Sequence, residues 1–213
     1  MNSIFPEVIR VLSMTFKNKE PTCVFIDSTY LYKIQKEFEK IYGEKYKLEY
    51  NQLAITLAKS QGLWLNSAFY YCAPPYQNPQ PSEEQRRRMA GYTKVMNYYR
   101  KNPNFYVREG RCQLIDGTYA EKGVDTLMVM DLMKITTMKD IKTIILLVCD
   151  TDFVPIINEL RSTYGIQIIL FHYTDRKRNS MFSMSNHLQT VSNKCILLQK
   201  EHFTSSLLRP KNK

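Results

Sequence analysis

The feature that most constrains this chain is an apolar run that ends in paired acids. Residues 144–148 read Ile-Ile-Leu-Leu-Val, and Asp150 and Asp152 follow before a helical pattern begins. A continuous apolar run of this kind is typical of a parallel strand that is buried on both faces. Carboxylates at the end of such a strand are costly unless a cation neutralises them. The apolar run at residues 23–26 ends in the same way, at Asp27.

The alternation of apolar runs with helical patterns predicts one α/β domain. We expect strands at 22–27, 63–72, 105–108, 143–149, 166–171 and 195–198, and helices at 28–42, 51–61, 82–101, 122–137, 153–163 and 180–190. This rhythm favours a mostly parallel sheet with helices on both faces. Residues 112–115 are expected to pair with the strand at 105–108 as a hairpin.

The two ends of the chain differ from this central domain. An amphipathic helical pattern at residues 3–16 predicts an extra N-terminal helix, which offers a surface for a homodimer. The final residues are basic and are expected to be frayed. We therefore divide the chain into an N-terminal helix (1–20), one domain (21–205) and a basic tail (206–213).

The net charge and the cysteines of the chain indicate its partner and its cellular compartment. The 213 residues suit a single domain, and the formal net charge of +10 favours a polyanionic partner, with simple solubility as the alternative. The five cysteines form no C-x-x-C pair, and Cys23, Cys149 and Cys195 lie in apolar runs, as expected for buried free thiols. Together with the absence of a signal peptide or a membrane-length apolar run, this predicts a cytoplasmic protein.

Four carboxylates are candidates for one site: Asp27, Asp125, Asp150 and Asp152. Helix capping explains Asp125 or Asp152 taken singly, whereas Asp27 and Asp150 follow strands and have no such simple explanation. If these two strands are neighbours, their ends lie about 5 Å apart. Oxygen-rich sites of this kind select Mg²⁺ or Mn²⁺, which activates water for attack on a phosphate.

A basic segment gives the polyanion a place to bind. Residues 83–111 hold eight Lys and Arg against three Glu, with tyrosines between them. Basic side chains hold phosphates and aromatic faces stack on unpaired bases, although a solvated helix face and core packing are the alternatives. The cations expected to contact nucleic acid are Arg86, Arg87, Lys94, Arg108, Lys122, Arg176, Lys177 and Arg178.

Five motifs in this order resemble the NYN domain family, a branch of the PIN-like nuclease superfamily. The family typically reads F-I-D-G-x-N-L, a strand with a proline loop, V-R-x-G, K-G-V-D and G-D-x-D-F-x-P. The matching segments are Val24–Asp27 with Leu31-Tyr32, Ala68–Pro75, Phe105–Gly110, Glu121–Asp125 continuing to Asp131, and Asp150–Pro155. The resemblance covers residues 22 to 200.

This resemblance implies a Rossmann-like, PIN-like fold and a Mg²⁺- or Mn²⁺-dependent endoribonuclease that hydrolyses single-stranded or structured RNA. It carries catalytic and metal-binding roles to the four candidate acids Asp27, Asp125, Asp150 and Asp152. Asp131 matches a further family acid, and Tyr30 stands where the family usually has Asn. We expect both to lie behind the metal-binding acids rather than on the ion.

Other functions are consistent with parts of this pattern. Tyr30, Ser28 and Val148-Cys149 depart from the family motifs, so an RNA-binding module with a decayed site is the main alternative. A phosphatase of the haloacid-dehalogenase type shares the strand-D-x-D pattern, but about 60 residues after it are too few for the rest of that fold. A scaffold whose acids only cap helices is the third. Discrimination between RNA and DNA stays open, because phosphate contacts do not read the sugar.

Overall fold

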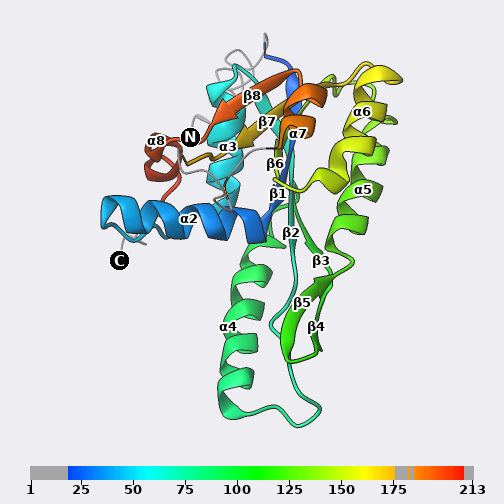
Figure 1. Ribbon diagram of the computed structural model, residues 1–213. Coiled ribbons are helices and arrows are strands. Elements are labelled where there is room, and N and C mark those ends of the chain that lie inside the picture. Colours follow the sequence, from blue (N-terminus) through cyan, green and yellow to red (C-terminus); the bar gives the residue numbers. More distant parts are fainter. Residues whose placement is uncertain (1–18, 176–181, 183–184, 209–213) are drawn as a thin grey trace, which may run out of the picture.

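The computed structural model describes residues 19–175, 182 and 185–208, and its centre is a six-stranded sheet (Figure 1). All neighbouring strands in this sheet are parallel, as the sequence predicts. In spatial order the strands are β3 (Phe105–Glu109), β2 (Trp64–Cys72), β1 (Pro21–Asp27), β6 (Thr143–Leu147), β7 (Gln167–His172) and β8 (Lys194–Leu197). The predicted α/β fold with a Rossmann-like parallel sheet is therefore confirmed.

Helices cover both faces of the sheet and bury two separate apolar cores. One face carries α2 (Ser28–Tyr42), α3 (Tyr50–Ser60) and α8 (Lys200–Thr204), and the other carries α5 (Val124–Ile135), α6 (Val154–Ser162) and α7 (Asn186–Val191). Strand residues alternate between these cores: Val24 and Ile26 enter the first, whereas Cys23 and Phe25 enter the second. This alternation follows from the two-residue period of a strand and explains why the strand is apolar throughout.

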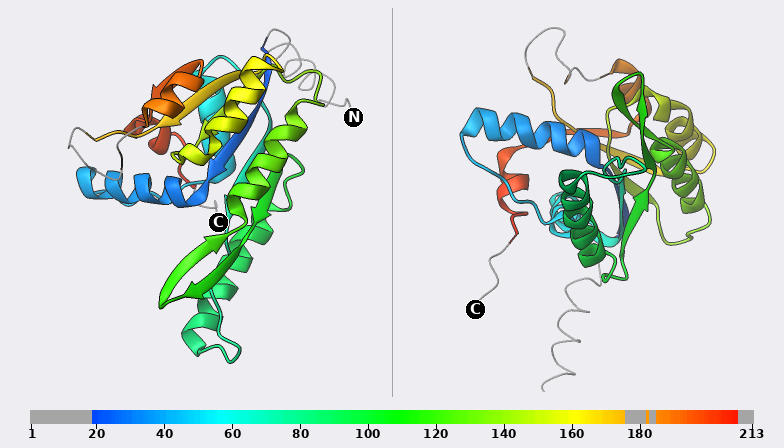
Figure 2. Two further views of the ribbon diagram at one scale, coloured as in Figure 1. Left: turned by 45° about the vertical axis from the view of Figure 1, so that its right-hand side comes forward. Right: turned by 90° about the horizontal axis from the view of Figure 1, so that it is seen from below.

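An arm extends from the sheet at its carboxyl edge. We define the arm as α4 (Glu83–Tyr99) together with the hairpin of β4 (Arg111–Ile115) and β5 (Thr118–Lys122). Figures 1 and 2 show α4 and this hairpin projecting together beyond the sheet. The helix starts at a capping box, in which Ser82 and Gln85 bond each other's backbone N–H groups. The arm therefore stands next to the edge at which Asp27 ends β1.

The hairpin corrects one sequence-based expectation. Residues 112–115 pair with 118–122 and not with 105–108, which instead form the edge strand β3 beside β2. The turn is Asp116-Gly117, and both residues have positive φ, 48° and 75°. Asp-Gly is the dipeptide that two-residue hairpins favour, so the sequence does carry the signal for this turn. The expected helix at 122–137 consequently begins only at Val124.

The ends of the chain are only partly described. The predicted N-terminal helix within residues 1–20, and with it the surface expected for a homodimer, lies almost wholly outside the described residues. The tail begins as ordered structure, because Leu207 forms a bridge with Leu48 and the Leu208 N–H donates to Lys47 at 2.7 Å. The short helix α8, which precedes this segment, was absent from the sequence-based prediction. None of the helices in the described part is long and apolar enough to cross a membrane.

Candidate active site

The predicted acids lie where the connections of the sheet change direction. From β1 the chain continues to β2 and β3 on one side, whereas β6 leads to β7 and β8 on the other. Strands β1 and β6 are adjacent and parallel, with Ile26 paired to Leu147. Open α/β sheets bind their ligands in the crevice outside the carboxyl ends of the strands at such a switch point. Asp27 ends β1 and Asp150 follows β6, so the topology brings both to this edge.

At the end of β1, Asp27 is half-buried and caps α2. Its Oδ1 accepts hydrogen bonds from the backbone N–H groups of Thr29, at 2.8 Å, and Tyr30, at 3.2 Å. Burial, with a smaller contribution from the charges of Glu121 and Asp125, raises the pKa of Asp27 to about 6 in spite of these bonds. A carboxyl group that titrates close to neutrality is characteristic of functional sites.

The other three predicted acids are exposed and interact through their charges. Desolvation raises the pKa of Asp125, and the negative charges of Asp150 and Asp152 add to that increase. Asp150 Oδ1 accepts a hydrogen bond from the Asp152 backbone N–H at 2.9 Å. Because Asp125 also raises the pKa of Asp27, the four acids form one electrostatically connected group.

The caps are not the ones that the sequence suggests. Capping was the simple explanation for Asp125 and Asp152, yet Asp27 caps α2 and Asp150 caps the turn η1 (Thr151–Phe153). Helix α5 has no side-chain cap and starts after Gly123, at a φ of 79°. In both capping acids the bonds go to Oδ1, and within the described residues Oδ2 accepts none. One oxygen of each carboxylate therefore stays available to a ligand.

These acids do not form a preassembled metal cage. Among the described residues, no group of three or more His, Cys, Asp or Glu side chains is arranged to hold a metal ion. Mg²⁺, however, commonly binds through one or two carboxylates and completes its shell with waters and substrate phosphates. Carboxylate oxygens are hard donors of the kind that suits Mg²⁺, Mn²⁺ or Ca²⁺.

Glu121 joins this group, although sequence reasoning did not select it. Its Oε2 accepts a hydrogen bond from Thr29 Oγ1 at 2.9 Å, and its charge raises the pKa of Asp27. Strand β5 places it there, with Glu121 paired to Cys112 across the hairpin. The Asp116-Gly117 turn was the signal that would have revealed this strand and hence the direction of Glu121.

Asp131 lies in a different environment, inside an ion-pair network. Arg108 donates to its carboxylate from Nε at 2.6 Å and from Nη2 at 3.2 Å, Lys134 Nζ donates at 2.9 Å, and the Tyr71 hydroxyl donates at 3.1 Å. Asp131 is 3% exposed. Both of its oxygens are occupied by these partners, and none of the four candidate acids is among them; its predicted role behind those acids stays a prediction. The guanidinium of Arg108, expected on RNA, is engaged here as well.

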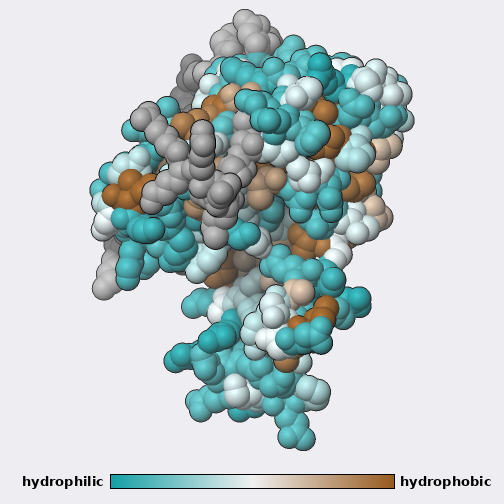
Figure 3. All heavy atoms as spheres, viewed as in Figure 1, coloured by the Kyte–Doolittle hydropathy of each residue, from teal (hydrophilic) through white to brown (hydrophobic). Residues whose placement is uncertain are grey.

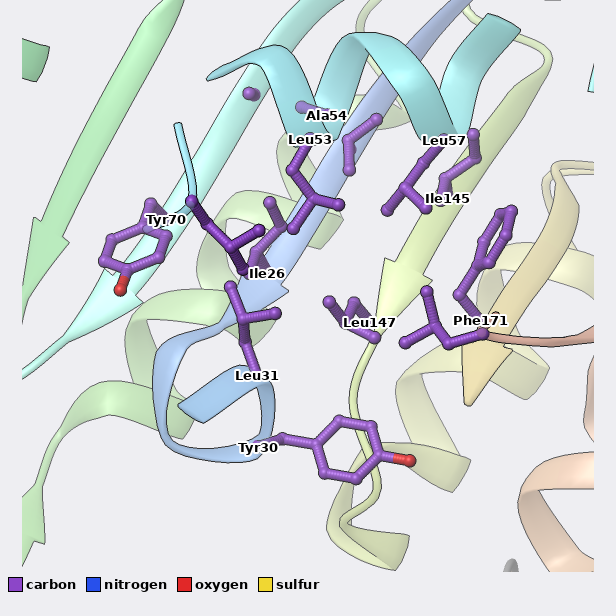
Figure 4. Packing of buried hydrophobic residues seen from close by; sticks show 14 of the residues in the cluster. Ile26, Tyr30, Leu31, Leu53, Ala54, Leu57, Tyr70, Ile145, Leu147 and Phe171 are labelled. Carbon is purple, nitrogen blue, oxygen red and sulfur yellow. The ribbon is translucent and has the colours of Figure 1, made fainter. Parts of the chain in front are cut away.

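The Tyr30 side chain is bonded to the Tyr173 backbone and not to the acids. Its ring is buried in the core under α2, and Figure 4 shows it extending past Leu147 toward the end of β7. The hydroxyl accepts a hydrogen bond from the Tyr173 backbone N–H at 2.9 Å and donates to the Tyr173 carbonyl at 3.4 Å. Tyr30 thus fastens α2 to the residue that directly follows β7, which the shorter side chain of an Asn would not reach.

The predicted RNA-binding cations fall into three groups. Arg108 is paired with Asp131, and Arg86 donates to the Pro81 carbonyl. Arg87, Lys94 and Lys122 are exposed and form no ion pair within the described part of the chain. The face of the arm visible in Figure 3 is mostly hydrophilic. The basic turn 176–178, Arg176, Lys177 and Arg178, lies outside the described residues.

Arg111 is a further cation that the sequence-based selection left out. It lies directly opposite Lys122 in the hairpin, and both side chains are exposed. Like charges in directly opposed positions destabilise a strand pair, and an anion between them removes that repulsion. Lys122 ends β5 three residues before Asp125, and Arg111 stands opposite it in the hairpin.

The cysteines are only in part the buried thiols that the sequence predicts. Cys23 is buried, but Cys195 is half-buried and Cys149 is exposed, because β6 ends at Leu147 before reaching it. All are free. Desolvation of the Cys149 thiol, followed by the charge of Asp27, raises its pKa to about 11, so it is a neutral neighbour of the acids.

Residues 21–197 match the NYN domain, and the chain belongs to this family. The family is generally nuclease-like, which supports a coarse assignment as a ribonuclease-type, nucleic-acid-binding domain. The match confirms the resemblance seen in the sequence motifs.

A solved structure shares the fold. The crystal structure of a protein of unknown function, VPA0982 from Vibrio parahaemolyticus RIMD 2210633, superposes with a TM-score of 0.53 at 17% identity. The superposition covers 89% of this chain and 97% of the other. At this identity the likeness concerns the fold alone. No curated protein matches the chain significantly.

Proposed function

We propose that this protein is an endoribonuclease that uses Mg²⁺ or Mn²⁺ to hydrolyse RNA phosphodiester bonds. The observation that carries the proposal is uncompensated negative charge at the switch point of the sheet. Asp27, Asp125 and Asp150 raise one another's pKa or that of a neighbour, and no Lys or Arg in the described part of the chain forms an ion pair with them. A bound dication would remove this repulsion.

In this proposal the acids would bind the metal ion and two cations would bind the RNA. Asp27 and Asp150 would hold the ion through Oδ2, since Oδ1 is committed to capping, and Asp125 would complete the set with Asp152 beside it. When bound, such an ion polarises the phosphate and lowers the pKa of its water. Asp27 must be deprotonated to bind, which its pKa of about 6 allows at neutral pH. Arg111 and Lys122 would hold a flanking phosphate and so fix the RNA against the acids.

The test is cleavage of a fluorescently labelled single-stranded RNA with added Mn²⁺ or Mg²⁺. We expect turnover that excess chelator abolishes and that falls at least about 100-fold in Asp150→Asn, because the charge that holds the ion is lost. Asp140→Asn is the matched control, since Asp140 is an exposed acid outside the site. Cleavage that persists in chelator contradicts the proposal, and a DNA strand of the same sequence tests sugar discrimination.

A binding-only module is the second candidate, and one observation favours it. The described residues contain no group of three ligands already arranged for a metal ion. Calorimetric titration with Mn²⁺ separates the candidates: a nuclease site gives heat at sub-millimolar ion that Asp150→Asn removes. A decayed module gives no such heat, yet it binds RNA with an affinity that falls steeply with salt.

A further inference from the structure

We propose that a cavity next to Asp27 binds one unpaired nucleobase of single-stranded RNA, an inference that rests on the proposed function. The cavity measures about 460 Å³, within the range of ligand pockets. It lies between α2, α3, α4, the end of β2 and β5. The lining residues that carry the argument are Tyr32, Tyr50, Tyr70, Tyr92, Lys33 and Glu121.

The cavity lies beside Asp27 in the chain, although none of the four acids lines it. Ser28 and Thr29, which directly follow Asp27, line it, and so does Glu121. Glu121 accepts a hydrogen bond from Thr29 and raises the pKa of Asp27, so the wall of the cavity and the acid group are in electrostatic contact. When a phosphate of the chain lies at the acids, the base of an adjoining nucleotide therefore lies at the cavity.

The chemistry of the lining favours a flat aromatic ligand. Four tyrosines reach the cavity from four different elements: Tyr32 from α2, Tyr50 from α3, Tyr70 from β2 and Tyr92 from α4. Tyr50 and Tyr70 already stack, with ring centroids 4.5 Å apart and planes at 15°. Tyr32 is 59% exposed, so its ring is accessible. Every base has a π-face, and stacking on tyrosine accepts any of them.

The charges that line the cavity favour the base inside it and the phosphate outside it. Glu121 repels a phosphate but not an uncharged base, so the base is the part of a nucleotide that enters. Lys33 is exposed, and it has no ion-pair partner in the described part of the chain. Its charge lowers the pKa of Cys149, which places Lys33 near the acids as well as on the cavity. Lys33 is thus positioned to bind the phosphate of the nucleotide whose base is held.

The test compares two ligands by fluorescence anisotropy in chelator, where cleavage is absent. One is a single-stranded RNA of about ten nucleotides, and the other is the same sugar–phosphate chain without bases. We expect the wild-type protein to bind the RNA about tenfold more tightly than the abasic chain. Tyr32→Ala should weaken RNA binding selectively and leave binding of the abasic chain unchanged, whereas Tyr32→Phe should restore the preference.

The control is Tyr164→Ala, which removes a comparably exposed tyrosine far from the cavity in the chain. Equal affinity of the wild-type protein for both ligands, or an equal effect of Tyr32→Ala on both, overturns the inference, as does failure to bind either ligand. Cleavage of RNA without a base preference contradicts the cavity but leaves the nuclease intact. A base preference without metal-dependent cleavage contradicts the nuclease and leaves the cavity.

Discussion

Asp27 and Asp131 are two acids of the same chain in opposite electrostatic situations. Asp131 is buried and meets two cations and a hydroxyl, so its charge is compensated within the fold. Asp27 is half-buried, and among the described residues it accepts hydrogen bonds from backbone N–H groups and forms no ion pair. Desolvation, helped by the charges of Glu121 and Asp125, leaves its pKa at about 6. The comparison shows where the fold supplies its own counter-charge and where it leaves the charge for a ligand to neutralise.

The largest change in stability is expected when Asp131, the acid with cationic partners, is replaced. Asp131→Ala should lower the free energy of unfolding by about 3 kcal/mol, because the buried Tyr71 hydroxyl loses its acceptor and Arg108 loses its partner. Urea denaturation measures this change. Asp125→Ala, an exposed acid of the same helix, is the control and should cost little. Equal losses for the two variants would show that Asp131 is not specially compensated.

Removing the charge of Asp27 should change the free energy of unfolding in the opposite direction, toward higher stability. Asp27→Asn should raise the free energy of unfolding by about 2 kcal/mol at pH 8, because the amide oxygen keeps the cap and the buried charge is gone. The folded carboxyl has a pKa of about 6 against the ordinary 3.8, so wild-type stability falls as pH rises from about 4 to 6.

The pH dependence supplies the control for this variant. At about pH 3.5 most of the Asp27 carboxyl is protonated in both states of the wild-type protein, so the difference from Asp27→Asn should become small. Unfolding curves at pH 3.5 and pH 8 measure it. A variant that is less stable than the wild type at pH 8 would mean that Asp27 is compensated after all.

A divalent cation should stabilise the folded protein by binding at Asp27, and it should have no effect through Asp131. At a Mg²⁺ concentration tenfold above Kd, binding should add about 1.4 kcal/mol, seen as a higher Tm in calorimetry. The shift should be smaller at pH 5 than at pH 7.5, because protons compete for Asp27 below its pKa of about 6. Asp27→Asn should abolish the shift and Asp140→Asn should keep it. An equal shift at both pH values would place the ion elsewhere.

Much of this contrast was accessible from the sequence. Apolar runs locate β1 and β6, and their adjacency in a parallel sheet brings Asp27 and Asp150 to one edge without any knowledge of side-chain contacts. The partners of Asp131 were not accessible in this way. Tyr71 lies on β2 and Arg108 on β3, so the network depends on side chains that meet across the sheet and α5.

Tyr30 shows the same limit more sharply. Its place in the motif suggests a position near the metal, yet its hydroxyl bonds a backbone segment 143 residues further along the chain. No local pattern encodes that contact, since it depends on how far a buried ring reaches. Glu121 differs, because reading Asp116-Gly117 as a hairpin turn would have found its strand.

The smallest expected effect tests whether the Tyr30 hydroxyl serves the packing of the core or the binding of the metal ion. Tyr30→Phe keeps the ring in the core but leaves the Tyr173 N–H without its acceptor, so unfolding should become easier by about 1 kcal/mol. Metal affinity and cleavage rate should not change, because the hydroxyl is bonded to the Tyr173 backbone and forms no hydrogen bond with the acids in the described part of the chain. Tyr164→Phe, on an exposed ring, is the control and should be neutral. If Tyr30→Phe instead weakened Mg²⁺ binding at unchanged stability, the hydroxyl would belong to the uncompensated site, and the core contact seen here would not be its main role.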